Sequence, residues 1–172
     1  ANIQPGERVL DVGSGLGIDS FLACHATGPH GKVIGIDISA KEVQHAQARA
    51  KHRGFDTEFL VADMESIPLP DNSIDVVISN GAFCLAPNKE KAFRELFRVL
   101  KPGGRISICT TTTQVENLEP GVSWPLCMKM FISKNEIEPL CEEIGYIDVV
   151  VDDSDSLMSM EMPEDILKES NP

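Results

Sequence analysis

The chain has 172 residues, with 27 Asp and Glu against 15 Lys and Arg, so its formal net charge at pH 7 is −12. This length fits one domain, and we expect residues 1–172 to form a single one. The negative charge repels nucleic-acid phosphates and anionic lipid headgroups, which argues against nucleic-acid partners. The sequence shows neither a membrane-spanning run of ~18 apolar residues nor a signal-peptide pattern, so we expect no membrane span and a cytoplasmic protein.

The five cysteines argue against a disulfide framework and against a metal centre. Their number is odd, and they stand at positions 24, 84, 109, 127 and 141. None of these spacings is a C-x-x-C pair or a zinc-ligand pattern. We therefore expect no metal, and we expect Cys109 to lie in a strand and Cys141 in the core.

The first predicted element is an apolar strand that starts at Val9 and runs into a glycine-rich loop. Gly13, Gly15 and Gly17 occupy alternate positions, and a helical pattern starts at Ile18. Alternate glycines let the backbone turn tightly and approach a ligand closely. The dinucleotide fingerprint is G-x-G-x-x-G, so the spacing here argues against a nicotinamide cofactor and leaves an oxidoreductase as a remote alternative.

Three further apolar segments carry a polar residue at or near their carboxyl ends. Residues 33–38 contain Asp37, twenty residues beyond Gly17, where a ribose-binding carboxylate is expected. Residues 59–64 contain Asp63, and residues 75–79 precede Asn80. Each aspartate also has a structural explanation, as a helix cap or a turn residue. Because ligands of open α/β sheets bind at the carboxyl ends of strands, the ordered set predicts one site there.

Helical patterns alternate with these segments, which predicts βαβ units and a mostly parallel sheet. Ser39 and Glu42 form a capping box for a helix that continues to about Arg53. Further helices are expected from about Asn88 to Leu100 and from Ser133 to Gly145, and further strands at residues 105–110, 146–152 and 157–162.

Together these motifs resemble the class I S-adenosylmethionine-dependent methyltransferases, most nearly the arsenite and ubiquinone/menaquinone biosynthesis methyltransferases. The resemblance covers residues 9–108. It implies a Rossmann-like, seven-stranded, mostly parallel α/β sheet with helices on both faces and an antiparallel last strand. It also implies S-adenosyl-L-methionine as cofactor and a small-molecule methyl acceptor. The implied cofactor residues are Asp11, Gly13, Ser14, Gly15, Gly17, Asp37, Ile38, Asp63, Met64 and Asn80.

The resemblance assigns further roles and leaves one part of the family unmatched. It implies that Asp63 accepts a hydrogen bond from the adenine amino group and that Met64 packs on the ring, although Met64 also suits the core. Small-molecule members usually carry N-terminal helices that close over the cofactor, whereas this chain begins almost on its first strand. We therefore expect such a lid segment to be absent.

The acceptor end resembles the arsenite enzymes in two segments. Residues 79–89 look like the region after the fourth strand of those enzymes, but Gly81 stands at one arsenic-binding cysteine and Cys84 is displaced by three residues. The segment with Trp124 and Cys127 looks like the place of another such cysteine. Cys84, Trp124 and Cys127 are the candidate substrate contacts, although a role as a buried packing residue is favoured for Cys127.

The predicted chemistry is methyl transfer by alignment of acceptor and cofactor, in which a general base is optional. The four histidines fall near helix ends or on a helix, where surface positions are expected. This favours a thiolate, trivalent arsenic, an amine or a stabilised carbanion as acceptor. Arsenite methylation proper and a catalytically inactive methyltransferase-like binding module remain alternatives, and the oligomeric state stays open.

Overall fold

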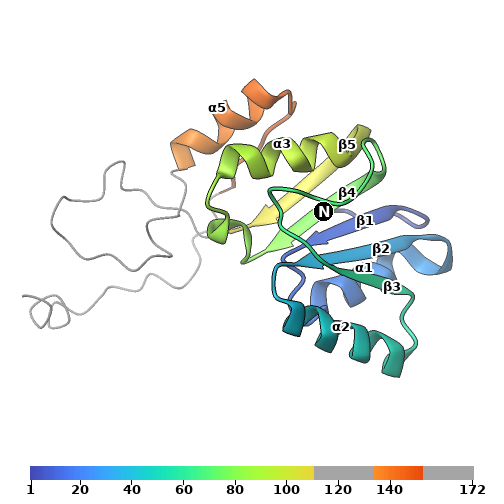
Figure 1. Ribbon diagram of the computed structural model, residues 1–172. Helices are drawn as coiled ribbons and strands as arrows, with labels where there is room; N and C mark the ends of the chain where they lie inside the picture. Colours follow the sequence, from blue (N-terminus) through green and yellow to red (C-terminus); the bar gives the residue numbers. More distant parts are fainter. Residues whose placement is uncertain (111–133, 153–172) are drawn as a thin grey trace, which may run out of the picture.

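The computed structural model describes residues 1–110 and 134–152, and in this part of the chain five parallel strands form one sheet (Figure 1). The strands lie in the order β3-β2-β1-β4-β5. Their bounds are Arg8–Val12 for β1, Lys32–Asp37 for β2, Thr57–Val61 for β3, Ile74–Asn80 for β4 and Leu100–Cys109 for β5. The order reverses between β1 and β4, so the switch point where open α/β sheets bind ligands lies between their carboxyl ends. The predicted Rossmann-like α/β class is confirmed.

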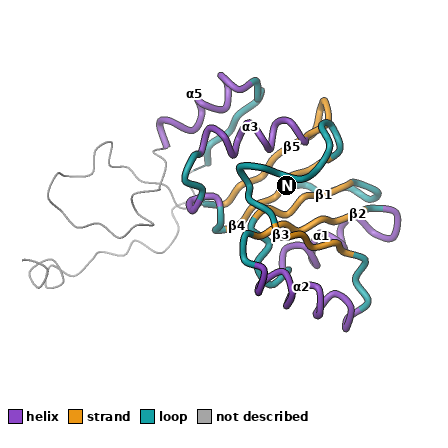
Figure 2. Tube along the Cα trace, viewed as in Figure 1, coloured by secondary structure: helices purple, strands orange, loops and turns teal. Residues whose placement is uncertain are grey.

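Helices cover both faces of the sheet (Figures 1 and 2). α1 (Ile18–Thr27) and α2 (Ala40–Arg53) lie on one face, and α3 (Lys89–Val99) and α5 (Lys134–Ile144) lie on the other. Two short 3₁₀ helices, η1 (Gly28–His30) and η2 (Phe83–Leu85), follow α1 and β4. Within the described ranges, no helix is both long and apolar enough to cross a membrane.

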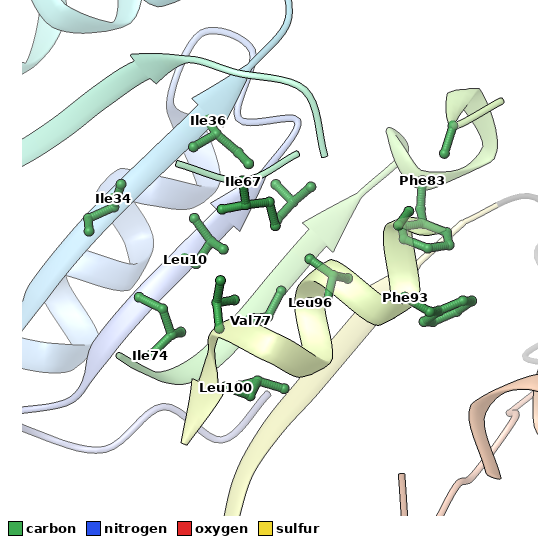
Figure 3. Close-up of a cluster of buried hydrophobic side chains, with 14 of the residues drawn as sticks. Leu10, Ile34, Ile36, Ile67, Ile74, Val77, Phe83, Phe93, Leu96 and Leu100 are labelled. Atoms are coloured by element: carbon green, nitrogen blue, oxygen red, sulfur yellow. The ribbon is translucent and has the colours of Figure 1, made fainter. Parts of the chain in front are cut away.

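The largest core cluster joins the central strands to α3 (Figure 3). Leu10 of β1, Ile34 of β2 and Val77 of β4 are buried on the same face of the sheet as Leu96 of α3. These strands are covered on both faces, which is why their sequences are almost continuously apolar. Cys141 of α5 is also buried in this cluster, as expected.

The helix ends agree with the local capping signals. The Ser39 hydroxyl accepts a 3.3 Å hydrogen bond from the Glu42 N–H at the start of α2, and α2 ends at Arg53. Asn88 caps α3 by accepting a 2.9 Å hydrogen bond from the Lys91 N–H. These caps satisfy N–H groups that the first helical turn leaves without an intrahelical partner.

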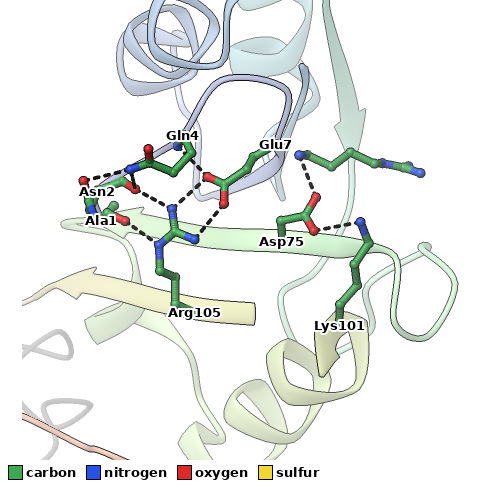
Figure 4. A network of polar contacts seen from close by, with 8 residues as sticks. Ala1, Asn2, Gln4, Glu7, Asp75, Lys101 and Arg105 are labelled. Atoms are coloured by element: carbon green, nitrogen blue, oxygen red, sulfur yellow. Dashed lines mark hydrogen bonds and ion pairs between the residues drawn. The ribbon is translucent and has the colours of Figure 1, made fainter. Parts of the chain in front are cut away.

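A salt-bridge network connects residues 1–7, the N-terminal arm, to the sheet (Figure 4). The Arg105 guanidinium of β5 donates two hydrogen bonds of 2.7 Å to the Glu7 carboxylate and one of 2.8 Å to the Ala1 carbonyl. Nearby, Asp75 accepts hydrogen bonds from the Arg8 N–H at 2.9 Å and from Lys101 Nζ at 2.7 Å. Asp75, at the amino end of β4, is therefore a structural residue.

Strand β5 begins earlier than predicted. It starts at Leu100, which pairs with Ile74, and the pairing shifts register before Arg105 pairs with Val76. Gly103 has φ +77°, a conformation that glycine adopts without steric cost. The residues before 105, which were not expected in a strand, therefore form an irregular part of β5, and Cys109 is the last residue of that strand.

The prediction of a strand at residues 146–152 is wrong, because these residues form no strand. The Tyr146 ring packs edge-on against Phe93 and Phe97, and its hydroxyl donates a 3.0 Å hydrogen bond to the Phe93 carbonyl. Asp148 has φ +54°, which is incompatible with a continuous strand. The predicted strand at residues 157–162 lies outside the described residues, so the structure describes five of the seven expected strands.

Candidate functional site

The glycine loop after β1 is anchored on the end of β2. The N–H groups of Gly13 and Ser14 both donate to the Ile36 carbonyl, at 2.8 Å and 2.9 Å. The Gly17 N–H closes the loop by donating to the Ser14 carbonyl at 2.8 Å. The loop is therefore held at the carboxyl edge of the sheet, where α1 begins.

The glycines serve two different purposes. A Cβ atom on Gly13 would lie 2.0 Å from Cβ of Ala82, and one on Gly17 would lie 2.8 Å from the Phe59 ring. These two positions require glycine so that the loop can pack against its neighbours. At Gly15 the nearest protein atom would be Glu42 Oε2 at 3.6 Å. The backbone of Gly15 therefore leaves room for a close ligand approach.

Asp37, the last residue of β2, joins the loop to the start of α2. Its Oδ2 accepts a 2.9 Å hydrogen bond from the Gly15 N–H, and its Oδ1 accepts one of 2.8 Å from the Ser39 N–H. Both bonds hold the carboxylate in one orientation at the mouth of the loop. The side chain remains partly exposed, so its oxygens have further capacity to accept from ligand hydroxyl groups.

Asp11 lies beneath the loop and is 2% exposed. Its Oδ2 accepts a 2.5 Å hydrogen bond from the Ser20 hydroxyl of α1. Burial raises the pKa of Asp11 to about 6; the Ser20 hydrogen bond opposes this rise, and the nearby Asp19 and Asp37 carboxylates add to it. Asp11 therefore supports the loop from below and does not face solvent.

The sequence suggested that Asp63 and Met64 end a strand. This is wrong, because β3 stops at Val61. Asp63 forms a tight turn in which its Oδ1 accepts a 2.9 Å hydrogen bond from the Glu65 N–H. The turn alternative foreseen for this aspartate is thus observed, although Asp63 remains exposed. Met64 is partly buried against the core, and the Ile38 side chain beside Asp37 is 75% exposed.

Asn80 ends β4 and contacts an acidic residue that the sequence analysis had not selected. Its Nδ2 donates a 3.2 Å hydrogen bond to Oδ2 of Asp19, in the first turn of α1. Both residues line a hollow of about 400 Å³, together with Cys109. A sequence signal for Asp19 exists, because acidic residues favour the first turn of a helix, but that signal says nothing about a ligand.

The loop also contains an unpaired buried hydroxyl. Oγ of Ser14 is buried and has no hydrogen-bond partner in the described part of the chain. Because a buried hydroxyl without a partner is unfavourable, this atom is a candidate contact for a ligand that fills the loop.

The predicted acceptor residues are only partly described. Cys84 is 8% exposed, and its Sγ donates to the Gly81 carbonyl at 3.5 Å. Trp124 and Cys127 lie outside the described residues. Among the four described cysteines, Cys109 is the exposed one, and its carbonyl accepts a 2.8 Å hydrogen bond from the Gly81 N–H.

Two other predictions concern metal ligands and histidines. In the described ranges, no group of three His, Cys, Asp or Glu residues is placed to hold a metal ion. The four histidines are all exposed, as predicted: His25, His30, His45 and His52.

The fold is an α/β domain with a glycine loop at the switch point of its sheet, and comparison with known proteins identifies the family. A family model described as a methyltransferase domain matches residues 3–145. The chain therefore belongs to this methyltransferase-domain family.

Two curated relatives illustrate the similarity. The arsenite methyltransferase of Halobacterium salinarum is 44% identical over 109 residues, which are 63% of this chain and 28% of that protein. The ubiquinone/menaquinone biosynthesis C-methyltransferase UbiE of Burkholderia multivorans is 37% identical over 108 residues, 63% of this chain and 44% of that protein. The chain thus spans less than half the length of these relatives.

Solved structures show the same fold. A SAM-dependent methyltransferase from Aquifex aeolicus superposes with a TM-score of 0.69 at 28% identity, covering 83% of this chain and 73% of that chain. The arsenic(III) S-adenosylmethionine methyltransferase of Chlamydomonas reinhardtii superposes with a TM-score of 0.73 at 27% identity, covering 84% of this chain and 53% of that chain.

Proposed function

We propose that this chain binds S-adenosyl-L-methionine and transfers its methyl group to a small-molecule acceptor. The observation that carries the proposal is the Asp37 carboxylate at the end of β2, joined to Gly15 of the glycine loop at 2.9 Å. A carboxylate in this position suits the two hydroxyl groups of a ribose, each of which can donate a hydrogen bond to it.

The charges around the loop favour a cationic cofactor over a dinucleotide. The carboxylates of Asp11, Asp19 and Asp37 lie near the loop. Asp11 accepts a hydrogen bond from the Ser20 hydroxyl, and Asp19 accepts one from the Asn80 side chain. A sulfonium and an α-amino group carry positive charge, whereas a dinucleotide brings a negatively charged pyrophosphate. Because opposite charges attract more strongly where water is partly excluded, this site suits the sulfonium cofactor.

The proposed adenine side consists of Ile38, Asp63 and Met64. Ile38 offers an exposed apolar surface beside Asp37, and Met64 offers a polarizable thioether at the next loop. Asp63 is exposed, and its carboxylate can accept a hydrogen bond from an adenine amino group. The amino-acid end of the cofactor is assigned to Gly13, Ser14, Gly17 and Asn80, with Asp11 as a support beneath the loop.

The bound cofactor supplies an activated methyl group, and the role of the chain is to align the acceptor with it. An in-line displacement needs close, oriented reactants and the exclusion of water. The described histidines are exposed, which favours an acceptor that needs little deprotonation. Thiolates, trivalent arsenic, amines and stabilised carbanions meet that condition, and Trp124 and Cys127 remain proposed acceptor contacts.

Arsenite methylation is the second candidate, because an arsenite methyltransferase is 44% identical over the matched region. Gly81 argues against it, because it stands where the arsenite enzymes are expected to have an arsenic-binding cysteine, and glycine carries no thiol. The φ of Gly81 is +72°, so a cysteine at this position would also be strained. We further propose the cytoplasm as compartment, since Cys24, Cys84, Cys109 and Cys141 are all free thiols.

The test is calorimetric titration of the purified chain with S-adenosylmethionine, S-adenosylhomocysteine and NADH in parallel. Binding of the two adenosyl ligands and not of NADH supports the proposal, and acceptor screening then begins with thiols and trivalent arsenic. Binding of NADH alone contradicts the cofactor assignment. Adenosyl binding without methyl transfer to any acceptor class would favour the inactive binding module.

A further inference from the structure

Glu65 lies between the turn that the proposed function assigns to the cofactor and the segment 81–88, which contains the candidate acceptor contact Cys84. It belongs to the tight turn that Asp63 forms after β3, where the Ser66 N–H donates to the Asp63 carbonyl at 3.0 Å. The Glu65 side chain is only 12% exposed, and its Oε1 accepts a 2.7 Å hydrogen bond from the Asn88 N–H. A residue on the cofactor side thus holds the end of the segment 81–88.

This contact replaces an interaction that α3 cannot make within itself. In a capping box, the third residue of a helix accepts a hydrogen bond from the N–H of the N-cap residue through a Glu or Gln side chain. The N-cap of α3 is Asn88 and the third residue is Lys91, a side chain without an acceptor. Glu65 supplies the missing carboxylate from another loop, and its Oε2 lies 3.8 Å from Lys91 Nζ.

The segment 81–88 is held at further points, so a shift at Asn88 reaches its interior. Lys89 Nζ donates to the carbonyls of Cys84, at 3.1 Å, and Ala86. Burial lowers the pKa of Lys89, while Cys84 and Glu65 oppose that decrease. Lys89 follows Asn88 directly, so a shift of Asn88 also moves the residue that carries this ammonium group.

The rest of the β3–β4 connection is fastened to α3 by other side chains. Glu95 accepts a 2.8 Å hydrogen bond from the Ile67 N–H, and Arg98 donates to the carbonyls of Ile67 and Leu69, both at 2.8 Å. These contacts lie farther along the chain from Asp63 than Glu65 does. Of these side-chain contacts between the β3–β4 connection and α3, the one made by Glu65 is therefore adjacent to the proposed adenine site.

We infer that Glu65 is a positioning residue that couples the cofactor-side turn at Asp63 to the acceptor-side segment 81–88. The inference rests on the proposed function, because it takes Asp63 as a cofactor contact. When ligand binding fixes the Asp63 turn, Glu65 fixes Asn88 through a charge-assisted hydrogen bond, and the segment becomes ordered before the acceptor arrives.

The experiment is amide hydrogen exchange of the whole chain with and without S-adenosylhomocysteine. Exchange at residues 85–91 reports the order of the acceptor-side segment; this range leaves out the end of β4. Exchange at the amides of the glycine loop reports ligand binding. Glu65→Ala removes the acceptor, Glu65→Gln keeps an amide oxygen in its place, and Lys91→Met removes only the 3.8 Å ion pair.

In the wild-type chain, the ligand should slow exchange both in the glycine loop and at residues 85–91. In Glu65→Ala, the Asn88 amide should exchange about tenfold faster without ligand, and ligand should protect the glycine loop but no longer residues 85–91. Lys91→Met should behave like the wild-type chain. Glu65→Gln, which keeps a neutral acceptor, should retain ligand-induced protection of residues 85–91 and should speed exchange of the Asn88 amide less than Glu65→Ala does.

Equal ligand-induced protection of residues 85–91 in Glu65→Ala and the wild-type chain would overturn the inference. So would a wild-type chain in which the ligand protects the glycine loop alone. If the ligand protects neither region of the wild-type chain, the proposed function itself fails and this inference fails with it.

Discussion

The N–H of Gly15 donates a 2.9 Å hydrogen bond to Oδ2 of Asp37, which joins the loop after β1 to the end of β2. The neighbouring Oδ1 accepts from the Ser39 N–H, so one carboxylate orients both the loop and the start of α2. A ribose bound at this carboxylate would therefore meet a loop that is already positioned. Preorganisation of this kind reduces the entropy lost on binding.

Asp37→Ala should weaken S-adenosylhomocysteine binding by about 1–3 kcal/mol, because a charged acceptor of hydrogen bonds is lost. Calorimetry measures the affinity, and circular dichroism should show an unchanged fold. Glu58→Gln on β3 alters an exposed 3.0 Å ion pair with Lys32 of β2; it is the control and should bind normally. An unchanged affinity in Asp37→Ala would remove Asp37 from the proposed cofactor site.

Asp11→Asn should change how stability depends on pH. Burial raises the pKa of Asp11 from 3.8 to about 6, so the folded chain binds a proton more tightly than the unfolded chain. The stability that protonated Asp11 contributes is fully present below pH 3.8 and is lost as the pH rises through about 6. Asparagine is neutral throughout and keeps a hydrogen-bonding side chain beside Ser20.

The variant should therefore gain stability relative to the wild-type chain between pH 4 and pH 7, by up to about 3 kcal/mol. Urea unfolding of both proteins at the two pH values measures this difference, and the titration of all other groups cancels in the comparison. A difference in unfolding free energy that does not depend on pH would contradict the raised pKa.

Gly13→Ala should destabilise the chain more than Gly54→Ala, although both glycines have φ +74°. Because both positions share this φ, we expect a similar backbone strain of about 1–2 kcal/mol at each. A Cβ atom on Gly13 would lie 2.0 Å from the Ala82 Cβ, whereas one on Gly54 meets nothing within 4 Å. The difference in unfolding free energy therefore measures the contact with Ala82.

A double variant tests the cause of that difference. Gly13→Ala combined with Ala82→Gly removes the clashing methyl group, so it should recover stability relative to Gly13→Ala alone. Strict additivity of the two substitutions would show that the two positions are not in contact.

Arg105→Gln should loosen the N-terminal arm, because the guanidinium holds Glu7 and the carbonyls of Ala1 and Asn2. We expect a loss of about 1 kcal/mol, since the ion pair is accessible to water. Faster hydrogen exchange at residues 1–7, with unchanged exchange in α2, is the expected measurement. Normal protection of the arm would contradict its attachment through Arg105.

The same contact has a pH dependence. The hydrogen bond from Arg105 is the main cause that lowers the pKa of Glu7 below 4.5, against a smaller rise from burial. Its contribution to stability is therefore present above pH 4.5 and lost as the pH falls through the lowered pKa. The difference between Arg105→Gln and the wild-type chain should shrink in acid, as urea unfolding at pH 3 and pH 7 would measure.

The sequence by itself determined the parallel sheet, the glycine loop and the start of α2 at Ser39. These features depend on short-range patterns: an apolar strand ending near an acid, alternate glycines, and a serine three residues before a glutamate. Such patterns act through neighbouring residues, so they can be recognised without knowing the rest of the fold.

Only the tertiary structure decided which distant residues meet at the site. Glu65 and Asn88 are 23 residues apart, and Arg105 and Glu7 are 98 apart, so no local pattern links them. The sequence of residues 146–152 is typical of a strand, but in the structure the Tyr146 ring packs edge-on against Phe93 and Phe97. Burial against a particular partner outweighs β propensity there, because propensity describes what a segment can form, whereas packing selects among those forms.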